Sequence, residues 1–570
     1  MPKCLFALTV LLSASLQARA EAPKDFEPLS PRVSCAALLK EHLDAAVGAA
    51  VRIEHAVEVA HEGHGYCEVD GTIAPKIRFE VRLPTSGWTQ RYLQLGCGGL
   101  CGVLNVRVEH ADDCVPVREH AIALASTDMG HQGQSMGDGS FGVDPQARID
   151  FAYRGVHLTA IAAKALQQKF YGVKPRRSYF MGCSDGGREA LMEAERFPAD
   201  FDGISAGAPA MNFLVQNTFY HAWMYAANHR ADGSAILTAA DLPALHAAAL
   251  ASCDAEDGLK DGQITDPRAC NFDPNEALCK SPGSRQGCLT VEQVEVARKF
   301  YEGPRDTAGH RFTIGGPQVG SELAWRGVFV PDGADGKVMS EGAALDTLRY
   351  LAFEENPGKN FSLADFHFDE ATFKRLEQLH PLYDATDTDL SGFTARGGKL
   401  LLWHGWSDPH ISPINTIAYY QGVRARLGAD KADESLRLFL VPGMYHCMGG
   451  DGTGSFDALT PLMSWVEQGK APEVIIAAHV DLPPMGPTPG TAKHDLRSPA
   501  HLPVTRTRPV YAYPKIARYA GKGSVEVAES FIAAEPLYAA PSSYEWEGAK
   551  FMAPHFLKDC QVAAGKLKCP

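Results

Sequence analysis

The feature that most constrains the fold is a short strand that runs directly into a serine between two glycines. Residues 176–198 read RRSYFMGCSDGGREALMEAERFP. The apolar run predicts a buried strand, and the segment after it predicts a helix that ends at Pro198. Gly182 and Gly186 allow a tight turn around Ser184, which would present the serine oxygen at the start of the helix. This pattern predicts a nucleophile on a strand–turn–helix elbow; the alternative is a glycine-rich loop that contains a serine.

Segments with the patterns of strands and helices alternate in two separate parts of the chain. Residues 66–95 alternate apolar and polar side chains, which predicts antiparallel strands with a turn at residues 84–87. Strand–helix alternation then continues to about residue 210, stops, and resumes at residue 396. We therefore predict an α/β fold, with one core interrupted by a large insertion. The expected segments are 1–20, a signal peptide; 21–210, the first part of the core; 211–395, the insertion; and 396–570, the second part of the core.

The amino terminus has the pattern of a secretory signal peptide. Lys3 precedes an apolar run from Leu5 to Leu12, and Ala18-Arg19-Ala20 is a small-x-small cleavage pattern. The alternative is a buried amino-terminal helix, and the run is too short to span a bilayer. A secreted or periplasmic location is therefore expected.

Charge and cysteine content limit the partners and the compartment. The formal net charge is −14, and no basic stripe is evident, which argues against nucleic acid and against an anionic membrane surface as partners. One of the 14 cysteines, Cys4, lies in the predicted signal peptide, so 13 remain. In an oxidising compartment most should form disulfides, and the odd number leaves at least one thiol free or paired outside the chain.

A base and an acid for the serine follow in the order that a strand–turn–helix nucleophile requires. The strand KLLLWHG leads into Asp408, and the strand LRLFLVPG leads into His446. The order serine, acid, histidine matches that of α/β-hydrolases, so we predict that Ser184, Asp408 and His446 form a catalytic triad. The alternatives are a helix cap for Asp408 and a structural loop histidine for His446. His404, His410 and Asp185 compete for these roles. His404 precedes Asp408 and breaks the order, and Asp185 directly follows the serine, where its main-chain amide is of better use.

Stabilisation of an oxyanion needs two main-chain amides. One is expected from Asp185, directly after the serine, and the second from the loop GCGGLCG, where Gly98 or Gly99 is the candidate. The alternative for this loop is a glycine turn held by cysteines.

The cysteines beside the serine and the histidine suggest a disulfide at the site. Cys183 precedes Ser184, and Cys447 follows His446, so hydrogen-bond contact between serine and histidine would bring the two sulfurs within bridging range. A thiol nucleophile at Cys183 is disfavoured, because secretion disfavours free thiols and the turn already aims the serine.

These motifs together resemble the tannase and feruloyl esterase family. The resemblance rests on CSDGGREA, HGWSD and YHCMGG, and on the blocks YCEVDGTIAPKIRFEVRLP, ERFPADFDGISAGAPA and ARGGKLLLWHGWSDPHISP. It implies an α/β-hydrolase core in which the insertion is a lid over the active site. It also implies the same triad, bridged by Cys183 and Cys447.

An acidic loop inside the insertion is a candidate metal site. Residues 253–270 read CDAEDGLKDGQITDPRAC, and the pattern alone fits either a solvated loop or a calcium site with oxygen ligands. The resemblance implies a structural calcium ion, and Cys253 and Cys270 should pair to close the loop. The implied ligands are the carboxylates and carbonyls of Asp254, Asp257, Leu259, Asp261 and Gln263. No organic cofactor is expected.

The remaining cysteines fall into short-range groups. We expect local bridges between Cys279 and Cys288 and between Cys35 and Cys67, and Cys560 could pair with Cys569. The odd thiol is expected among Cys97, Cys101 and Cys114.

The resulting functional hypothesis is a secreted serine carboxylesterase. The resemblance implies small aromatic-acid esters as substrates: gallates, ferulates and other hydroxycinnamates, or terephthalate monoesters. Trp223, Trp325 and Phe329 of the insertion could stack on such a ring or could form the core of the lid. The alternatives are a non-catalytic protein that binds aromatic esters or glycans on a hydrolase scaffold, and a secreted peptidase with the same triad.

Overall fold

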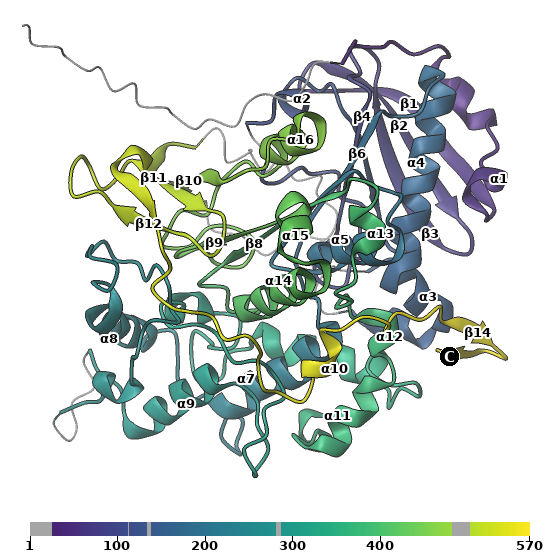
Figure 1. Cartoon of the computed structure of the whole chain (residues 1–570). Coiled ribbons are helices and arrows are strands. Elements are labelled where there is room, and N and C mark those ends of the chain that lie inside the picture. Colours follow the sequence, from purple (N-terminus) through teal and green to yellow (C-terminus); the bar gives the residue numbers. More distant parts are fainter. Residues whose placement is uncertain (1–25, 112, 134–137, 281–286, 482–501, 570) are drawn as a thin grey trace, which may run out of the picture.

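The fold is built around one twisted mixed sheet (Figure 1). The computed structural model describes residues 26–111, 113–133, 138–280, 287–481 and 502–569. The predicted signal peptide lies outside the described residues. The nine strands follow in spatial order: β1 (Val51–His61), β2 (His64–Ile73), β3 (Ile77–Pro84), β5 (Ala123–Thr127), β4 (Arg91–Leu95), β6 (Arg177–Cys183), β7 (Gly203–Gly207), β8 (Lys399–Gly405) and β9 (Leu436–Val441).

One part of the strand prediction is correct and one part is wrong. Strands β2 and β3 are antiparallel, as expected for residues 66–84. Strand β4, however, lies between β5 and β6 and runs parallel to both. Residues 84–87 therefore lead from β3 to a strand that is not its neighbour, and the predicted antiparallel turn is wrong. All five residues of β4 are buried, which is typical of a parallel strand covered on both faces.

Both faces of the parallel strands are covered, and this explains the continuous apolar runs in the sequence. Along β6, Tyr179 and Met181 pack into one hydrophobic cluster while Phe180 packs into the other. Helices α4 (Gly155–Tyr171), α5 (Asp185–Arg196) and α14 (Pro413–Leu427) contribute to the cluster that contains Phe180, and α16 (Leu459–Gln468) covers the opposite face. The smaller helices of the core are α1 (Asp44–Val47), α2 (Val115–Arg118), α3 (Pro145–Ile149) and α15 (Ala429–Ser435).

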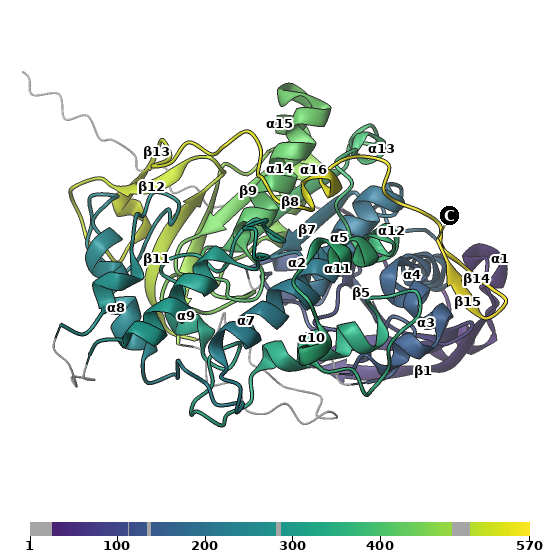
Figure 2. The ribbon, with the colours of Figure 1, turned by 90° about the horizontal axis from the view of Figure 1, so that it is seen from below.

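The segment between β7 and β8 adds no strand to the central sheet among its described residues. Most of its helices lie below the sheet in Figure 1, and therefore in front of it in Figure 2, while the last of them lies beside α5. Tyr220, Trp325 and Phe329 are completely or almost completely buried in a separate hydrophobic cluster of this segment. For Trp325 and Phe329 the structure therefore supports the core alternative over a ring-binding role. The helices are α6 (Phe213–Val215), α7 (His221–Asn228), α8 (Leu242–Cys253), α9 (Val291–Glu302), α10 (Met339–Tyr350), α11 (Glu370–Glu377), α12 (His380–Tyr383) and α13 (Ser391–Thr394).

Carboxyl-terminal hairpins complete the chain. The first of them lies next to the sheet edge, where Phe439 of β9 bridges to Ala512. Among the described helices, none combines the length and the apolarity that crossing a bilayer requires. The strands of these hairpins are β10 (Val474–Val480), β11 (Val504–Tyr511), β12 (Ile516–Tyr519), β13 (Phe531–Ala534), β14 (Gln561–Ala563) and β15 (Lys566–Lys568).

Candidate active site

Ser184 is the single residue between strand β6 and helix α5. Its φ of 65° is unusual for a residue with a side chain and stores backbone strain on the order of 1–3 kcal/mol. The flanking glycines are required by close packing of the backbone. A Cβ at Gly182 would lie 2.4 Å from the carbonyl oxygen of Gly186, and a Cβ at Gly186 would lie 2.9 Å from that of Cys97. The sequence therefore forms a strained, tightly packed elbow that holds the serine at the start of α5.

The structure brings Ser184, His446 and Asp408 into one hydrogen-bonded chain. The His446 Nε2 atom lies 2.9 Å from Ser184 Oγ, and its Nδ1 atom lies 2.7 Å from Asp408 Oδ2. The three residues follow β6, β9 and β8, and the carboxyl ends of parallel strands meet at one edge of a sheet. In this arrangement the imidazole can accept the serine proton while the carboxylate stabilises the resulting imidazolium.

Asp408 is completely buried and has four hydrogen-bond contacts. The main-chain amides of His410 and Ile411 donate to Oδ1 at 2.8 and 3.1 Å, and His404 Nε2 lies 3.1 Å from Oδ2, beside the contact from His446. Burial alone would raise the pKa of Asp408, but the charge of His446 and the hydrogen bonds from His404 and His446 hold that pKa well below its usual range. Asp408 therefore stays ionised throughout the physiological pH range.

His404, which competes for the role of base in the sequence, has a different place in the structure. Its Nδ1 atom lies 2.8 Å from Thr416 Oγ1, while Nε2 faces Asp408. The imidazole therefore orients the acid and has no contact with the serine in the described structure. Its position four residues before Asp408, at the end of a buried strand, was the available signal for this supporting role.

Two further histidines lie close to His446: His410, the other competitor from the sequence, and His221, which the sequence pattern does not single out. The ring of His410 lies 4.5 Å from that of His446, and the ring of His221 lies 6.2 Å from that of His410. Burial, together with the charge of His446, lowers the pKa of His221 to about 3 and that of His410 well below its usual value. Both imidazoles are therefore neutral at physiological pH and add no positive charge around the base.

The insertion contacts the loop that carries the acid. The Tyr220 hydroxyl donates to the Pro409 carbonyl at 2.7 Å, Gln216 Nε2 donates to the His410 carbonyl, and the Ser407 hydroxyl donates to the Gly320 carbonyl at 3.2 Å. These contacts seat helix α7 and the π-helical turn Gln216–Tyr220 beside the triad. The predicted lid boundaries at residues 211 and 395 remain predictions.

The candidate oxyanion donors lie on two segments that touch. Asp185 is the first residue of α5, and its carboxylate points into the core, where Arg188 donates two hydrogen bonds to it at 2.7 and 3.0 Å. Its amide and that of Gly98 have no main-chain acceptor among the described residues. Free amides at a helix start beside the serine can bind a developing negative charge. Gly99, with a φ of 63°, is the next residue of the same loop.

The disulfides account for all the described cysteines except one. Cys183 pairs with Cys447, with their Cα atoms 5.9 Å apart, so a covalent link joins the elbow to the histidine loop. Cys114 is the buried free thiol, which agrees with the expectation that the odd cysteine lies among three. The other bridges are Cys35–Cys67, Cys97–Cys101, Cys253–Cys270, Cys279–Cys288 and Cys560–Cys569.

The acidic loop fits a hard cation in its donor chemistry. Burial, with repulsion from Asp261 and Asp254, raises the pKa of Asp257, and Gly258 and Gly262 have φ values of 90° and 80°. Two features oppose a preformed site. Asp261 Oδ2 is paired with Arg508 at 2.6 Å. In addition, the carboxylates of Asp254, Asp257 and Asp261 do not form a group, among the described residues, in which the oxygen ligand atoms all lie within 4.8 Å of one another. A bound ion would therefore have to draw the carboxylates together.

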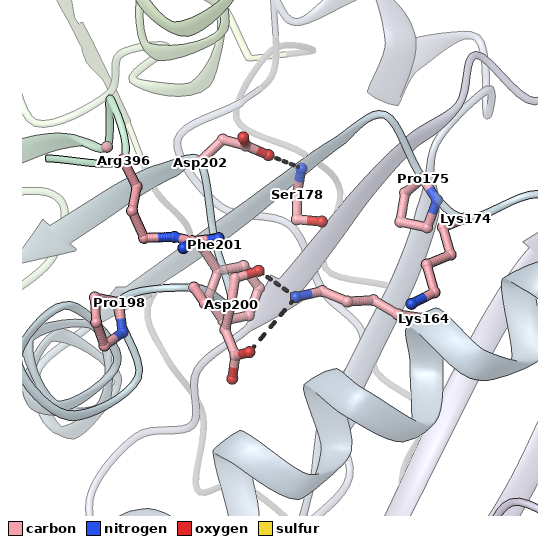
Figure 3. A pocket seen from close by; sticks show the side chains of 11 residues that line it. Lys164, Lys174, Pro175, Ser178, Pro198, Asp200, Phe201, Asp202 and Arg396 are labelled. Carbon is pink, nitrogen blue, oxygen red and sulfur yellow. Dashed lines mark hydrogen bonds and ion pairs between the residues drawn. The ribbon is translucent and has the colours of Figure 1, made fainter. Parts of the chain in front are cut away.

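A separate polar cavity of about 300 Å³ lies at the opposite edge of the sheet (Figure 3). Ser178 and Asp202, which line it, lie at or just before the amino ends of β6 and β7, whereas Ser184 follows the carboxyl end of β6. Lys164 reaches into the cavity and donates to the main-chain carbonyl of Asp200. This cavity is therefore separate from the triad.

Comparison with known proteins identifies the family. Residues 59–534 match the family model described as tannase and feruloyl esterase. The chain is 34% identical to the mono(2-hydroxyethyl) terephthalate hydrolase of Piscinibacter sakaiensis, with 83% of this chain and 85% of that protein covered. It is 33% identical to a probable feruloyl esterase B-2 of Aspergillus flavus, with 70% and 76% covered.

A solved structure supports the same assignment. The crystal structure of feruloyl esterase B from Aspergillus oryzae matches with a TM-score of 0.70 and 28% identity, over 85% of this chain and 96% of that one. The predicted α/β-hydrolase core is thereby confirmed. The chain belongs to the tannase and feruloyl esterase family and is a carboxylic ester hydrolase of that type.

Proposed function

We propose that the chain is a secreted serine esterase that hydrolyses small aromatic-acid esters through an acyl-enzyme. The observation that carries the proposal is the hydrogen-bonded chain from Ser184 through His446 to the buried Asp408. His446 takes the proton of Ser184 as the serine oxygen attacks the ester carbonyl. The proton then passes to the departing alcohol, and water releases the acid by the same steps in the second half of the cycle.

The tetrahedral intermediates carry a negative charge that needs fixed donors. The amide of Asp185 and that of Gly98 or Gly99 would supply them, in a site where neighbouring histidines are neutral. Preorganised donors of this kind act because they need no reorientation as the charge develops.

The substrate class is proposed from the relatives. One relative is named for mono(2-hydroxyethyl) terephthalate and another for ferulate, and both names describe esters of aromatic acids. Six disulfides support an oxidising compartment, in agreement with the predicted signal peptide.

We also propose that the acidic loop binds a structural calcium ion. Asp254, Asp257 and Asp261 would contribute carboxylates, and Leu259 and Gln263 would contribute carbonyls. The supporting observations are the raised pKa of Asp257, caused by burial and by repulsion from Asp261 and Asp254, and the bridge Cys253–Cys270, which closes the loop. The ion would neutralise this repulsion and take no part in the chemistry at Ser184.

Hydrolysis of an ester panel tests the proposed activity. Methyl gallate, methyl ferulate, mono(2-hydroxyethyl) terephthalate and a short p-nitrophenyl ester would be offered to wild type, to Ser184→Ala and to Ser391→Ala, which changes an exposed serine on α13. We expect activity in wild type and in Ser391→Ala, and a loss of at least about 10⁴-fold in Ser184→Ala. Equal rates in all three proteins would contradict the proposal.

A further inference from the structure

The loop that carries the second candidate oxyanion donor is closed by its own disulfide. Residues 96–102 read GCGGLCG, directly after β4, and Cys97 pairs with Cys101 only four residues later. The bridge therefore encloses Gly98, Gly99 and Leu100 in a small covalent ring. Proton transfer among Ser184, His446 and Asp408 does not require a bridge in this loop.

This ring lies directly against the nucleophile elbow. The Gly96 amide donates to the Met181 carbonyl at 2.9 Å, and a Cβ at Gly186 would lie 2.9 Å from the Cys97 carbonyl oxygen. A change in the shape of the ring would therefore move its amides relative to Ser184.

The backbone of the ring has a conformation that needs external support. Gly99 and Cys101 have φ values of 63° and 60°, and the left-handed region is unfavourable for cysteine. Inside the ring the described main-chain hydrogen bonds include that from the Cys101 amide to the Gly98 carbonyl at 3.0 Å. One such bond is a weak restraint on a glycine-rich loop, so the disulfide supplies the constraint.

A buried carboxyl group contacts both sulfur atoms of the bridge. Glu189 lies one turn after Asp185 on α5 and is 1% exposed, with Oε1 2.7 Å from Cys97 Sγ and 3.4 Å from Cys101 Sγ. Its Oε2 atom has no hydrogen-bond partner in the described structure. Burial, reinforced by the charge of Asp185, raises the pKa of Glu189 well above its usual range. Glu189 is therefore a neutral group packed beneath the bridge.

We propose that the Cys97–Cys101 bridge and the Glu189 carboxyl are positioning elements of the oxyanion hole, which hold the amides of Gly98 and Gly99 in the geometry that the tetrahedral intermediate requires. This inference rests on the proposed esterase function. The bridge spans few residues, so it constrains the unfolded chain much less than the Cys183–Cys447 bridge, whose partners are 264 residues apart. Its main effect is therefore local geometry.

A metal ion is the competing occupant of the same cluster. Cys97, Cys101, Asp185 and Glu189 place four ligand atoms within 4.8 Å of one another. Both oxygens of Asp185 are already bound by Arg188, however, and sulfurs joined in a disulfide are not thiolate ligands. The bridge is the chemistry that this geometry favours.

The test separates positioning from general stability. The double variant Cys97→Ser/Cys101→Ser, Glu189→Ala and Glu189→Gln would be compared with wild type and with Cys560→Ser/Cys569→Ser, which removes a short bridge at the carboxyl terminus. The readouts are kcat and KM on a p-nitrophenyl ester, affinity for a phenylboronic acid that forms a tetrahedral adduct with the serine, and the melting temperature.

We expect the first double variant and Glu189→Ala to lose about 100-fold in kcat, with KM changed less than about threefold, because an oxyanion donor acts only on the transition state. Boronic acid affinity should fall by a similar factor. Glu189→Gln, which keeps a neutral group of the same shape, should stay within about threefold of wild type. The melting temperature of each variant should stay within about 5 °C of wild type.

Five results would each overturn the inference. Three of them concern the Cys97/Cys101 double variant: a kcat equal to that of the Cys560/Cys569 control, an effect on KM alone, or loss of folded protein. The other two concern the purified wild type: two alkylatable thiols, or one bound zinc ion per chain, at this cluster. Failure of the proposed function would be seen separately, as absence of ester hydrolysis by wild type itself.

Discussion

Removal of the Cys183–Cys447 bridge should reduce both stability and turnover. The partners of this bridge are 264 residues apart, whereas those of the terminal bridge Cys560–Cys569 are 9 residues apart. The chain-entropy relation for cross-links predicts a loss of roughly 5.5 kcal/mol for the long loop and about 2.6 kcal/mol for the short one. With an unfolding entropy of about 2.1 cal/mol/K per residue over 570 residues, these losses correspond to falls of about 5 °C and about 2 °C in melting temperature.

Turnover should fall with stability in the long-bridge variant, because the bridge joins the residues next to Ser184 and His446. Loss of the covalent link allows the 2.9 Å contact between Ser184 Oγ and His446 Nε2 to lengthen, and a displacement of about 1 Å costs up to about 100-fold in rate. The assay is thermal unfolding followed by circular dichroism, with kcat measured on the same samples, for Cys183→Ser/Cys447→Ser and Cys560→Ser/Cys569→Ser. Equal falls in melting temperature for the two variants, or an unchanged kcat in the first, would refute this reasoning.

Four further predictions concern individual residues. Asp408→Asn should lower kcat by about 10⁴-fold with little change in KM, because the amide cannot stabilise the imidazolium; steady-state kinetics measure this, and a loss below tenfold would contradict it. His221 has a pKa lowered to about 3, so below pH 6.5 the unfolded chain binds a proton that the folded chain does not, and stability is lost as the pH falls. His221 should account for about 2 kcal/mol of the stability lost between pH 7 and pH 5 in urea unfolding, and His221→Gln should reduce the loss by that amount; an identical pH dependence in the variant would count against it. Chelation with EDTA should lower the melting temperature of wild type but not of Asp257→Asn, and metal analysis that finds no calcium in the untreated protein would exclude the site. Burial raises the pKa of the Cys114 thiol, so iodoacetamide should label it only after unfolding, and rapid labelling of the native protein would contradict this.

The triad geometry was predictable because its members follow apolar strand-like runs. Ser184, Asp408 and His446 each come shortly after such a run, and parallel strands bring their carboxyl ends to one edge of the sheet. The adjacent cysteines then made the Cys183–Cys447 pairing predictable by proximity. These inferences need only local pattern and a general rule of topology.

Other parts of the site depend on packing that the sequence pattern does not encode. The place of β4 between β5 and β6 depends on crossovers of the chain, so adjacency in sequence suggested the wrong neighbour. Glu189 reads as an ordinary polar position of a helix, and its contact with the Cys97–Cys101 ring arises because α5 packs under a loop that comes 92 residues earlier. The low pKa of His221 likewise depends on its burial in the folded chain and on the charge of His446.

The most direct test of the proposed mechanism is covalent trapping of the nucleophile. The protein would be incubated with a p-nitrophenyl phosphonate, and the adduct would be located by intact-mass analysis and peptide mapping in wild type, His446→Ala and Ser184→Ala. The triad predicts one adduct per chain on Ser184 in wild type, much slower labelling in His446→Ala and none in Ser184→Ala. An adduct on another residue, or equal labelling in all three proteins, would contradict it.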